Sequence, residues 1–533
     1  MVPAWLGELS ASEHRLWQAF GSGETVDLSA AGAADRSVRG AVVAALLLGA
    51  QPAPAGRVPA VRLVGATVTG GLDVANGHVA YALALRSCRV DGPVLLDDAV
   101  LKAVDLHGSR LSVLSANGAH VDGSLDLTGA VFGSGPPDPH RTALHAERLV
   151  VDGDLRAGRI RVAGSVCLIG ARVSGQVALT EAELTQPDGT CLNVGGIHVG
   201  RSLLLIRLRA TGEVRMAGAQ AGTVLLSGAR LANPGGTALY AEAIGTVGDL
   251  IARGGFHADG EVYLAAARIG GGVFLQGAQL LGYDRPALDC SGMEVGRSLY
   301  LSGGFAARGE IRLTGCRVDG HLDLTGMACP EGRLVLYAVR VGRLRDEAAC
   351  WPPVVNLDGF SYDSIEEPLT ARRRLRLLAR QEGGYRAQPY GQLAAYYRSL
   401  GHDEEARNVL LARQRARRGA VARPWRIFGY LQDALVGYGY RPLRAVAWGL
   451  TLLVAGTEYF RHVPPAAVHP ADRPHFNALL YTADLMIPIF GLGERDTWQP
   501  RGVAQAVAVA LILSGWALGL AVAAAATRAL TRN

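Results

Sequence analysis

Apolar and polar residues alternate along most of the first 345 residues, and the alternation repeats in a recognisable form. The stretch VDGSLDLTGA at 121–130 returns as VDGHLDLTGM at 318–327, and many copies between them share the template apolar-x-Gly-x-apolar-x-apolar. A period of two is typical of a β-strand with one buried face. Clear copies begin at Val162, Val173, Ala210, Ala258 and Ile269, and in the copies that begin at Val199 and Val295 an arginine replaces the glycine.

Several copies follow one another at a spacing of 11, as from Val162 to Val173. An odd spacing would turn an uninterrupted strand inside out, so each copy must contain a corner. We expect the corner at G-A-[RQ] stretches such as 170–172 and 277–279, because glycine adopts positive φ angles without strain.

A longer period of 47 to 49 residues lies above the first one. It is marked by leucines that each follow a Pro/Gly-rich break, namely Leu144, Leu192, Leu239, Leu288 and Leu336. Such regularity predicts stacked units, each of two coils of roughly 24 residues with one protruding loop. The loops are expected around Pro136, Pro187, Pro234 and Asp284.

The fold class that follows is mainly β, with a parallel β-solenoid repeat domain over residues 58–345. A leucine-rich horseshoe would need a helical half in each repeat, and the sequence lacks one. The pattern does not set the handedness of the solenoid. Residues 1–57 are expected to form an N-terminal helical cap over the first coil, in which LSASEHRLWQAF is a helix with Ser12 as its N-cap.

The composition changes after the solenoid, and residues 346–440 are expected to form an α-helical basic adaptor. The stretch at 388–418 resembles one tetratricopeptide-type (TPR-like) helical hairpin, with packing residues at Tyr390, Leu393, Tyr397, Gly401, Ala406 and Leu410. A single hairpin is too short for a peptide-binding groove, so a packing role is expected.

Residues 441–533 are predicted to form a membrane domain with a two-helix transmembrane hairpin, whose spans lie at about 443–460 and 503–526. The second span carries no charge between Arg501 and Arg528, and it is long enough to cross a bilayer. The first is weaker, since only 445–457 is free of charge. Arginines before the first span and after the second place both flanks in the cytoplasm.

Two candidate sites follow from this arrangement. An arginine cluster before the first span is expected to contact anionic lipid headgroups rather than nucleic acid, and it comprises Arg413, Arg415, Arg417, Arg418, Arg423 and Arg426. The broken segment 475–493 reads as a re-entrant or interfacial plug or an oligomer contact. A pore is the alternative, with Asp484, Pro488, Gly491 and Gly493 as its residues, although a filter-like T-x-G-Y-G run is absent.

No motif in the chain predicts catalysis. There is no G-x-G-x-x-G turn, no H-E-x-x-H and no G-x-S-x-G, and Lys102 is the only lysine, which excludes a P-loop. Seven cysteines without a C-x-x-C pair suit small buried thiols better than disulfides or a zinc site. Asp73, Asp126 and Asp323 are expected to face outward without a pocket that could raise their pKa values. We therefore predict no catalytic, cofactor-binding or metal-binding residue.

The solenoid resembles pentapeptide-repeat and bactofilin-like solenoids. Through SEHRLWQAF, YGQLAAYYRSLGHDEEAR, VGYGYRP and LLYTADLMIPI, the whole chain also resembles a family of actinobacterial membrane proteins. Automatic annotation often labels that family membrane-associated oxidoreductase. The resemblance implies a redox enzyme as an alternative function, and it names no cofactor site in this sequence.

The sequence as a whole predicts a non-catalytic, membrane-anchored scaffold or sensor. It carries a net charge of +6 and begins without a secretory signal. We expect a multi-pass protein of the cell membrane, with the solenoid and both termini in the cytoplasm. The expected partners are anionic lipids, a cytoplasmic protein and further copies of the chain, but not nucleic acid. The alternatives are a two-span oligomeric ion pore gated by the solenoid and the membrane-associated oxidoreductase.

Overall fold

The computed structural model divides the chain into two units, which are treated separately below. One comprises Met1–Leu369 with Arg376–Glu382, and the other comprises Thr370–Leu375 with Gly383–Asn533. The structure describes residues 2–52, 55–133, 142–329, 331–366, 370–420, 443–468, 475–487 and 491–530.

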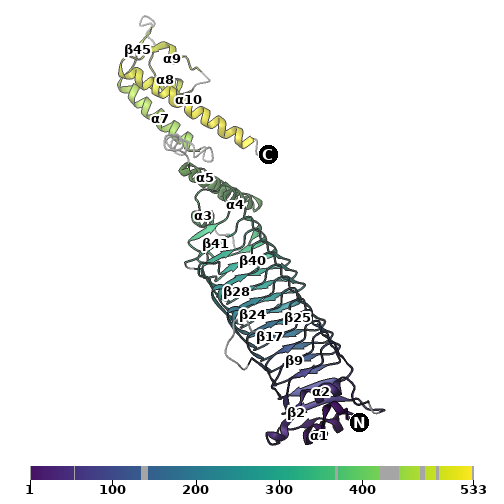
Figure 1. Ribbon diagram of the computed structural model, residues 1–533. Helices are drawn as coiled ribbons and strands as arrows, with labels where there is room; N and C mark the ends of the chain where they lie inside the picture. The colour runs from purple at the N-terminus through teal and green to yellow at the C-terminus, as the bar shows by residue number, and fades with distance from the viewer. Residues whose placement is uncertain are drawn as a thin grey trace. The chain divides into compact units, whose positions relative to one another are not determined.

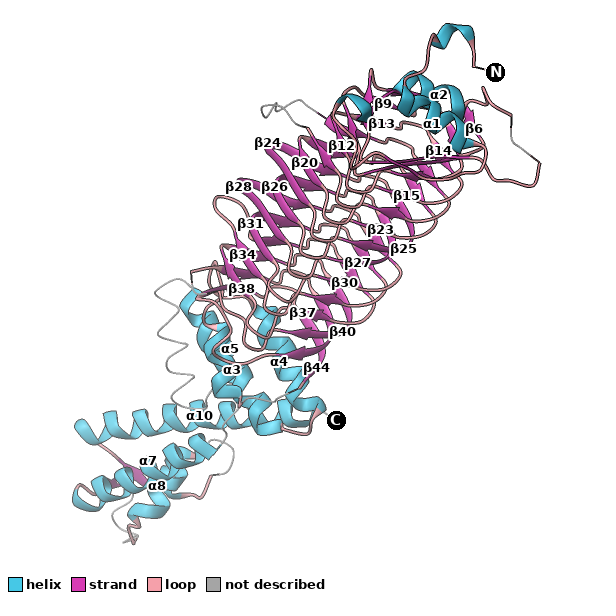
Figure 2. Ribbon diagram, turned by 90° about the horizontal axis from the view of Figure 1, so that it is seen from below, coloured by secondary structure: helices cyan, strands magenta, loops and turns pink. Residues whose placement is uncertain are grey.

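The first unit is a parallel β-solenoid of about 13 turns over residues 60–365 (Figure 1). Its strands form two ladders, in which each strand pairs in parallel with the strand one turn later (Figure 2). In one ladder β22 (Arg172–Val173), β25 (His198–Leu204) and β27 (Gln220–Leu225) align Val173, Val199 and Ala221. The predicted fold of this region is therefore confirmed, and like residues lie above one another inside the tube.

Corners occur where the residue adopts the left-handed conformation. Gly170 and Gly277 have φ angles of 63° and 69°, as the sequence predicts. Other corners use residues with a side chain, such as Arg148, Arg159 and Glu181, whose φ angles are 56°, 54° and 58°. Each such residue costs conformational strain. Neighbouring turns over-determine the corner, so glycine is preferred there but not required.

The 48-residue period has a structural cause in the second ladder. The Pro/Gly-rich breaks at Pro187 and Pro234 are built into long strands, β24 (Glu183–Asn193) and β28 (Arg230–Tyr240), where they interrupt the register. The strand on the next turn carries a glycine at that point, Gly212 or Gly260, with φ of 110° or 125°. A Cβ on Gly212 would lie 2.3 Å from the carbonyl oxygen of Gln186. Each break therefore closes over a glycine on the following turn, and the repeat needs two turns.

The other two expected loops differ in what the structure describes. Asp284 lies in an exposed turn between β34 (Gln279–Leu281) and β35 (Leu288–Asp289). Pro136 lies outside the described residues.

The N-terminal helix α1 (Ala11–Phe20) packs on β3 (Ala60–Val64), and α2 (Gly40–Leu47) packs on β5 (Leu72–Asp73). The prediction of Ser12 as the N-cap is wrong. Ser10 caps α1 in a reciprocal capping box with Glu13, whereas the Ser12 hydroxyl donates to the carbonyl of Asp35. Both serines fit a cap preference, and only the tertiary contact to Asp35 distinguishes them.

The solenoid continues to residue 365 and not to the predicted 345. Beyond residue 345, Trp351 is buried and donates its indole N–H to Asp346 (2.6 Å). The open edge of β43 (Val354–Asn356) is covered by residues 380–382. The amide of Val355 donates to the carbonyl of Arg380 (3.1 Å), and the amide of Glu382 donates to the carbonyl of Val355 (2.8 Å). A covered edge resists pairing with another chain.

The second unit is helical. Residues of helix α3 (Ala371–Leu378) are divided between the two units, and α4 (Ala387–Ser399) and α5 (Asp403–Ala420) pack as a hairpin around Gly401. The residues predicted for this hairpin are buried, namely Tyr390, Leu393, Tyr397, Ala406 and Leu410. The described part of the unit continues with the helices α7 (Leu443–His462), α8 (Ala478–Met486), α9 (Glu494–Thr497) and α10 (Val503–Leu530), and with an antiparallel pair of β45 (Ala466–Ala467) and β46 (Trp498–Gln499).

The cap gives the first prediction, because Glu13 and Arg39 hold α1 to the chain before α2. Arg39 donates to both Glu13 carboxylate oxygens (2.8 and 2.7 Å). Burial raises the pKa of Glu13, but the hydrogen bonds from Arg39 and Ser10 outweigh it and lower that pKa to about 2. A lowered pKa stabilises the fold above the usual value near 4.5, and the stabilisation is lost as pH falls toward 2.

We expect Arg39→Met to lower the free energy of opening of α1 by about 2 kcal/mol at pH 7. The difference from wild type should shrink as the pH falls from 4.5 to 2, down to the pH-independent part contributed by the hydrogen bonds from Arg39 to the carbonyls of Leu6 and Glu8. Hydrogen exchange of residues 11–20, corrected for intrinsic rates, measures it. Arg36→Met is the control, since Arg36 binds the carbonyl of Ala31. A difference for Arg39→Met that does not shrink over this range would refute the assignment.

Candidate functional site

Helix α10 has the surface of a helix surrounded by apolar material. Its buried residues follow spacings of four and three, at Ala504, Ala508, Leu511, Gly515 and Leu518. Apart from Gln505, the exposed residues between Val503 and Leu520 are apolar, with Leu513 at 64% and Leu520 at 65% exposure. A surface helix in water is polar on its open side. Among the described residues, Val503–Leu520 is the one helical stretch long and apolar enough to cross a membrane.

Helix α7 has 20 residues but carries Arg444, Glu458 and Arg461. By length and composition it does not qualify as a span, so the described residues contain one candidate membrane-spanning helix where the sequence predicts two. Its apolar residues are nevertheless exposed along one stripe, at Val446, Leu450 and Val454. These positions are four residues apart and therefore share a face.

Glycines let α8 pack closely between α7 and α10. A Cβ on Gly515 of α10 would lie 2.1 Å from the carbonyl oxygen of Met486, at the end of α8. A Cβ on Gly456 of α7 would lie 2.6 Å from the Thr482 methyl group. Close backbone approach at small residues is the usual packing of membrane helices. The other end of α8 packs in an aromatic cluster of Phe460, Phe476, Tyr481 and Trp498.

The candidate pore residue Asp484 is buried in this bundle, with 1% of its surface exposed. One carboxylate oxygen accepts from the amide of Leu492 (2.6 Å) and the other from the amide of Arg495 (2.7 Å). The carboxylate thereby ties the returning chain and the start of α9 to α8. Gly493, with φ of 85°, makes the turn before α9, and Gly491 is exposed. Pro488 lies outside the described residues. A structural role explains Asp484, and the pore stays an untested alternative.

The described arginines of the predicted lipid cluster lie in the C-terminal half of α5. Arg413 donates to the hydroxyl of Tyr385 (3.4 Å), and Arg415 and Arg417 are exposed, with Arg418 half-buried nearby. The first turn of α5 holds Asp403, Glu404 and Glu405, so acidic residues begin the helix and basic residues end it. This order stabilises a helix through its dipole. Arg423 and Arg426 lie outside the described residues.

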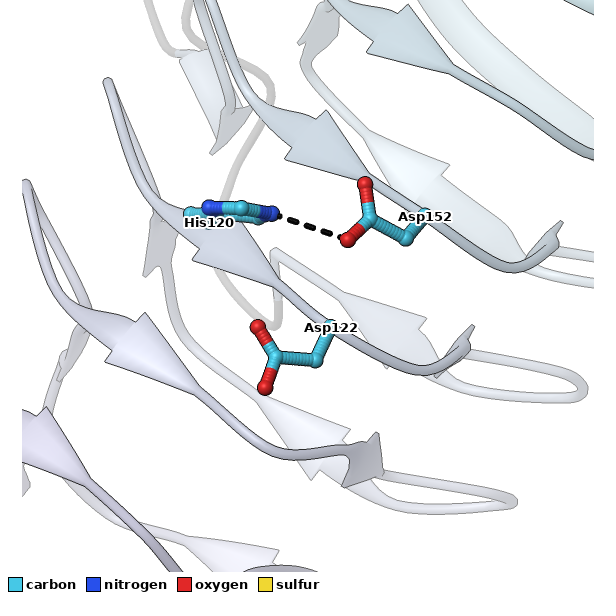
Figure 3. Close-up of side chains that lie close together, drawn as sticks. All are labelled: His120, Asp122 and Asp152. Carbon is cyan, nitrogen blue, oxygen red and sulfur yellow. Dashed lines mark hydrogen bonds and ion pairs between the residues drawn. The ribbon is translucent and has the colours of Figure 1, made fainter.

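One cluster of potential metal ligands was not predicted. His120, Asp122 and Asp152 lie on neighbouring turns, with one ligand atom of each within 4.8 Å of the others (Figure 3). The His120 imidazole contacts the Asp152 carboxylate (3.1 Å), and the Lys102 ammonium contacts Asp122 (3.3 Å). The repeated V-D-G at 121–123 and 151–153 is the signal that could have revealed it. All three groups are open to solvent, and each carboxylate already has a partner within the chain, so the cluster is explained as a set of polar surface contacts.

The outward carboxylates of the sequence prediction lie in different surroundings. Asp73 is exposed on the second ladder, whereas Asp126 and Asp323 belong to the first. Asp323 is only 5% exposed, because Thr325 donates to it and Arg345 lies over it at 3.8 Å. The alternation in the sequence predicts that a side chain points outward, but it does not predict whether neighbouring side chains bury it.

All seven cysteines are unpaired, and six are buried. Burial raises the pKa of Cys88 to about 11 and the pKa values of Cys191 and Cys316 to about 12. Thiols with such pKa values stay protonated at neutral pH and are poor nucleophiles. A shallow groove of about 550 Å³ on the solenoid is lined by His198 and, among other residues, by Gly200, Gly222, Arg172 and Arg268.

No protein-family model, curated protein or solved structure shows significant similarity to this chain. The pentapeptide-repeat-like solenoid rests on the structure itself. The resemblance to the actinobacterial membrane family, with its oxidoreductase label, stays a prediction from sequence.

The packing of α8 gives a direct test. Gly515→Leu places a side chain where the Met486 carbonyl lies, so we expect it to displace α8 and to destabilise the helical unit by about 2 kcal/mol or more. Gly449→Leu on α7 is the matched control, because a Cβ there meets no atom within 4 Å. Loss of helical circular dichroism during SDS titration in detergent measures both. Equal midpoints for the two variants would show that the bundle is packed differently.

Proposed function

We propose that the chain is a membrane-anchored scaffold, in which the helical unit holds the protein at a bilayer and the solenoid presents its outer surface to other proteins. The apolar, exposed circumference of α10 is the observation that carries the anchor. Exposure of that apolar surface to water would cost a large free energy, whereas lipid chains would cover it.

In the proposed topology α10 and α7 both span the membrane. Helices α8 and α9 then return into the bilayer from the outer side, and the two flanks are cytoplasmic. Snorkelling of Arg444 and Arg461 and pairing with α10 would let the short apolar stretch of α7 cross. The α5 arginines would meet anionic headgroups of the cytoplasmic leaflet.

The solenoid suits a scaffold for a mechanical reason. Each turn bonds only to its neighbours, and parallel pairing links one described turn to the next over residues 60–365, so the unit is long and stiff. Its described surface offers charged ladders and shallow grooves, which suit protein contacts better than enclosure of a small substrate. A cytoplasmic protein partner, assembly into a homo-oligomer and the absence of nucleic acid binding belong to the same proposal.

Membrane association is tested by alkaline carbonate extraction of bacterial membranes that contain the full chain. We expect the wild type to stay in the membrane pellet and the double variant Leu513→Asp with Leu520→Asp to leave it or to be degraded. Val247→Asp is the matched control, because Val247 is 86% exposed on the solenoid. A wild-type chain that enters the soluble fraction contradicts the anchor.

Topology is tested with Ala466→Cys, which lies between α7 and α8 and is exposed. A membrane-impermeant maleimide should label the introduced thiol in intact cells. The native cysteines all belong to the solenoid unit, and only Cys167 among them is not buried, so background labelling is expected from Cys167 and only after lysis. If the thiol of the Ala466→Cys variant also reacts only after lysis, the two-span topology is overturned while the anchor is left in place.

A further inference from the structure

An apolar strip lies on the outer face of the solenoid at mid-length. It is a ladder of outward-facing residues on six consecutive turns, at the ends of β23 (Val177–Ala178), β25, β27, β30 (Leu250–Ile251), β33 (Val273–Phe274) and β37 (Leu299–Tyr300). Its members are Ala178, Leu204, Leu225, Ile251, Phe274 and Tyr300, each paired with the next in the ladder. All six remain partly exposed.

The solenoid does not need apolar residues at this position. The equivalent ladder of the other sheet, on the same part of the chain, consists of Asn193, Arg215, Tyr240, Tyr263, Asp289 and Arg312. There Arg215 lies 4.3 Å over the ring of Tyr240, and Arg312 pairs with Asp289 at 3.1 Å. The inward-facing core residues are alike in both sheets, so the apolar strip serves a purpose outside the core.

Charged residues close the strip at both ends. On the side of the N-terminus the ladder continues with Arg156 and then Asp126, and on the other side with Asp323 and then Arg345. The order along the solenoid is therefore negative, positive, six apolar residues, negative, positive. If this order is reversed and laid against itself, opposite charges meet at the outer ends, where Asp126 faces the half-exposed Arg345. The inner positions, Arg156 and Asp323, are also of opposite charge, but each is already paired within its own chain, Arg156 with Asp154 (3.1 Å) and the 5% exposed Asp323 with Arg345 (3.8 Å).

We propose that the apolar strip binds the same strip of a second copy of this chain, with the two solenoids antiparallel. The two-fold axis runs along the strands between Leu225 and Ile251. Small then faces large, since Ala178 lies opposite Tyr300 and Leu204 opposite Phe274. At about 4.8 Å per turn the apolar contact is about 24 Å long. A parallel pair would set Asp126 against Asp126 and Arg156 against Arg156, which is unfavourable.

The charge pattern is what selects a second copy over an unrelated partner. A strip that is complementary to its own reversed order is the property of an isologous two-fold interface. The pairing uses only residues of the solenoid unit, and it does not rest on the membrane anchor. A strip one residue wide gives a small interface, so we expect dissociation in the micromolar range.

Analytical ultracentrifugation of the full chain in detergent, over about 1 to 100 μM, tests the pairing. We expect a concentration-dependent dimer for the wild type and a monomer for Phe274→Asp. Tyr263→Asp is the matched control, because Phe274–Tyr300 and Tyr240–Tyr263 are equivalent stacked pairs on the two sheets (5.0 and 5.2 Å between ring centroids). Monomeric wild type, or a folded Phe274→Asp that dimerises like the control, overturns the proposal.

The orientation is tested by exchanging charges. Asp126→Arg should weaken the dimer about tenfold, because it faces Arg345 of the second copy, and Arg345→Asp in the same chain should restore it. In a parallel pair, residue 126 of one copy faces residue 126 of the other, so Asp126→Arg would replace two facing negative charges with two facing positive charges. Arg345→Asp would then not strengthen the dimer. Unchanged dimerisation by Asp126→Arg, or the lack of rescue by the double variant with an unchanged far-UV spectrum, contradicts the antiparallel arrangement.

Discussion

Backbone hydrogen bonds between successive turns are the interaction on which the whole solenoid depends. The amide of Leu125 donates to the carbonyl of Asp154 (3.0 Å), and the amide of Val224 donates to that of Asp249 (3.0 Å), each one turn further along. Because each turn is held only by its neighbours, stability is a sum over turns and the ends are its weak points. This explains why α1 and α2 cover the first turn and why residues 380–382 complete the last.

The same constraint decides which side chains are tolerated where turns meet. Glycine is needed at Gly212 and Gly260, where the insertion of one turn lies against the next, and the two-turn period of the sequence follows from that contact. Outward ladder positions are free of this demand. They can carry ion pairs, aromatic stacks or the apolar strip, and the surface of the solenoid is therefore the part of the molecule where function can vary.

Much of this architecture can be predicted from the sequence, because residues that stack on successive turns occupy equivalent positions of a sequence repeat. The alternation, the corners at 170–172 and 277–279 and the 48-residue period all have direct structural counterparts. What could not be read depends on contacts between distant residues. Ser10 caps α1 because the Ser12 hydroxyl donates to the carbonyl of Asp35 instead. Trp351 belongs to the solenoid because its indole N–H donates to the Asp346 carboxylate. Asp484 is likewise held by the amides of residues that follow it by eight and eleven positions. The span predicted at 443–460 carries charged residues, and composition does not determine whether such a helix lies in lipid.

Hydrogen exchange of the full chain, followed by mass spectrometry, tests the ladder most directly. If the turns are bonded in parallel as described, amides in the strands between 162 and 323 exchange about four orders of magnitude more slowly than in an unstructured chain, with faster exchange toward both ends. Rapid, uniform exchange throughout these central strands would mean that the turns are not bonded to one another, and the account of the solenoid would fail.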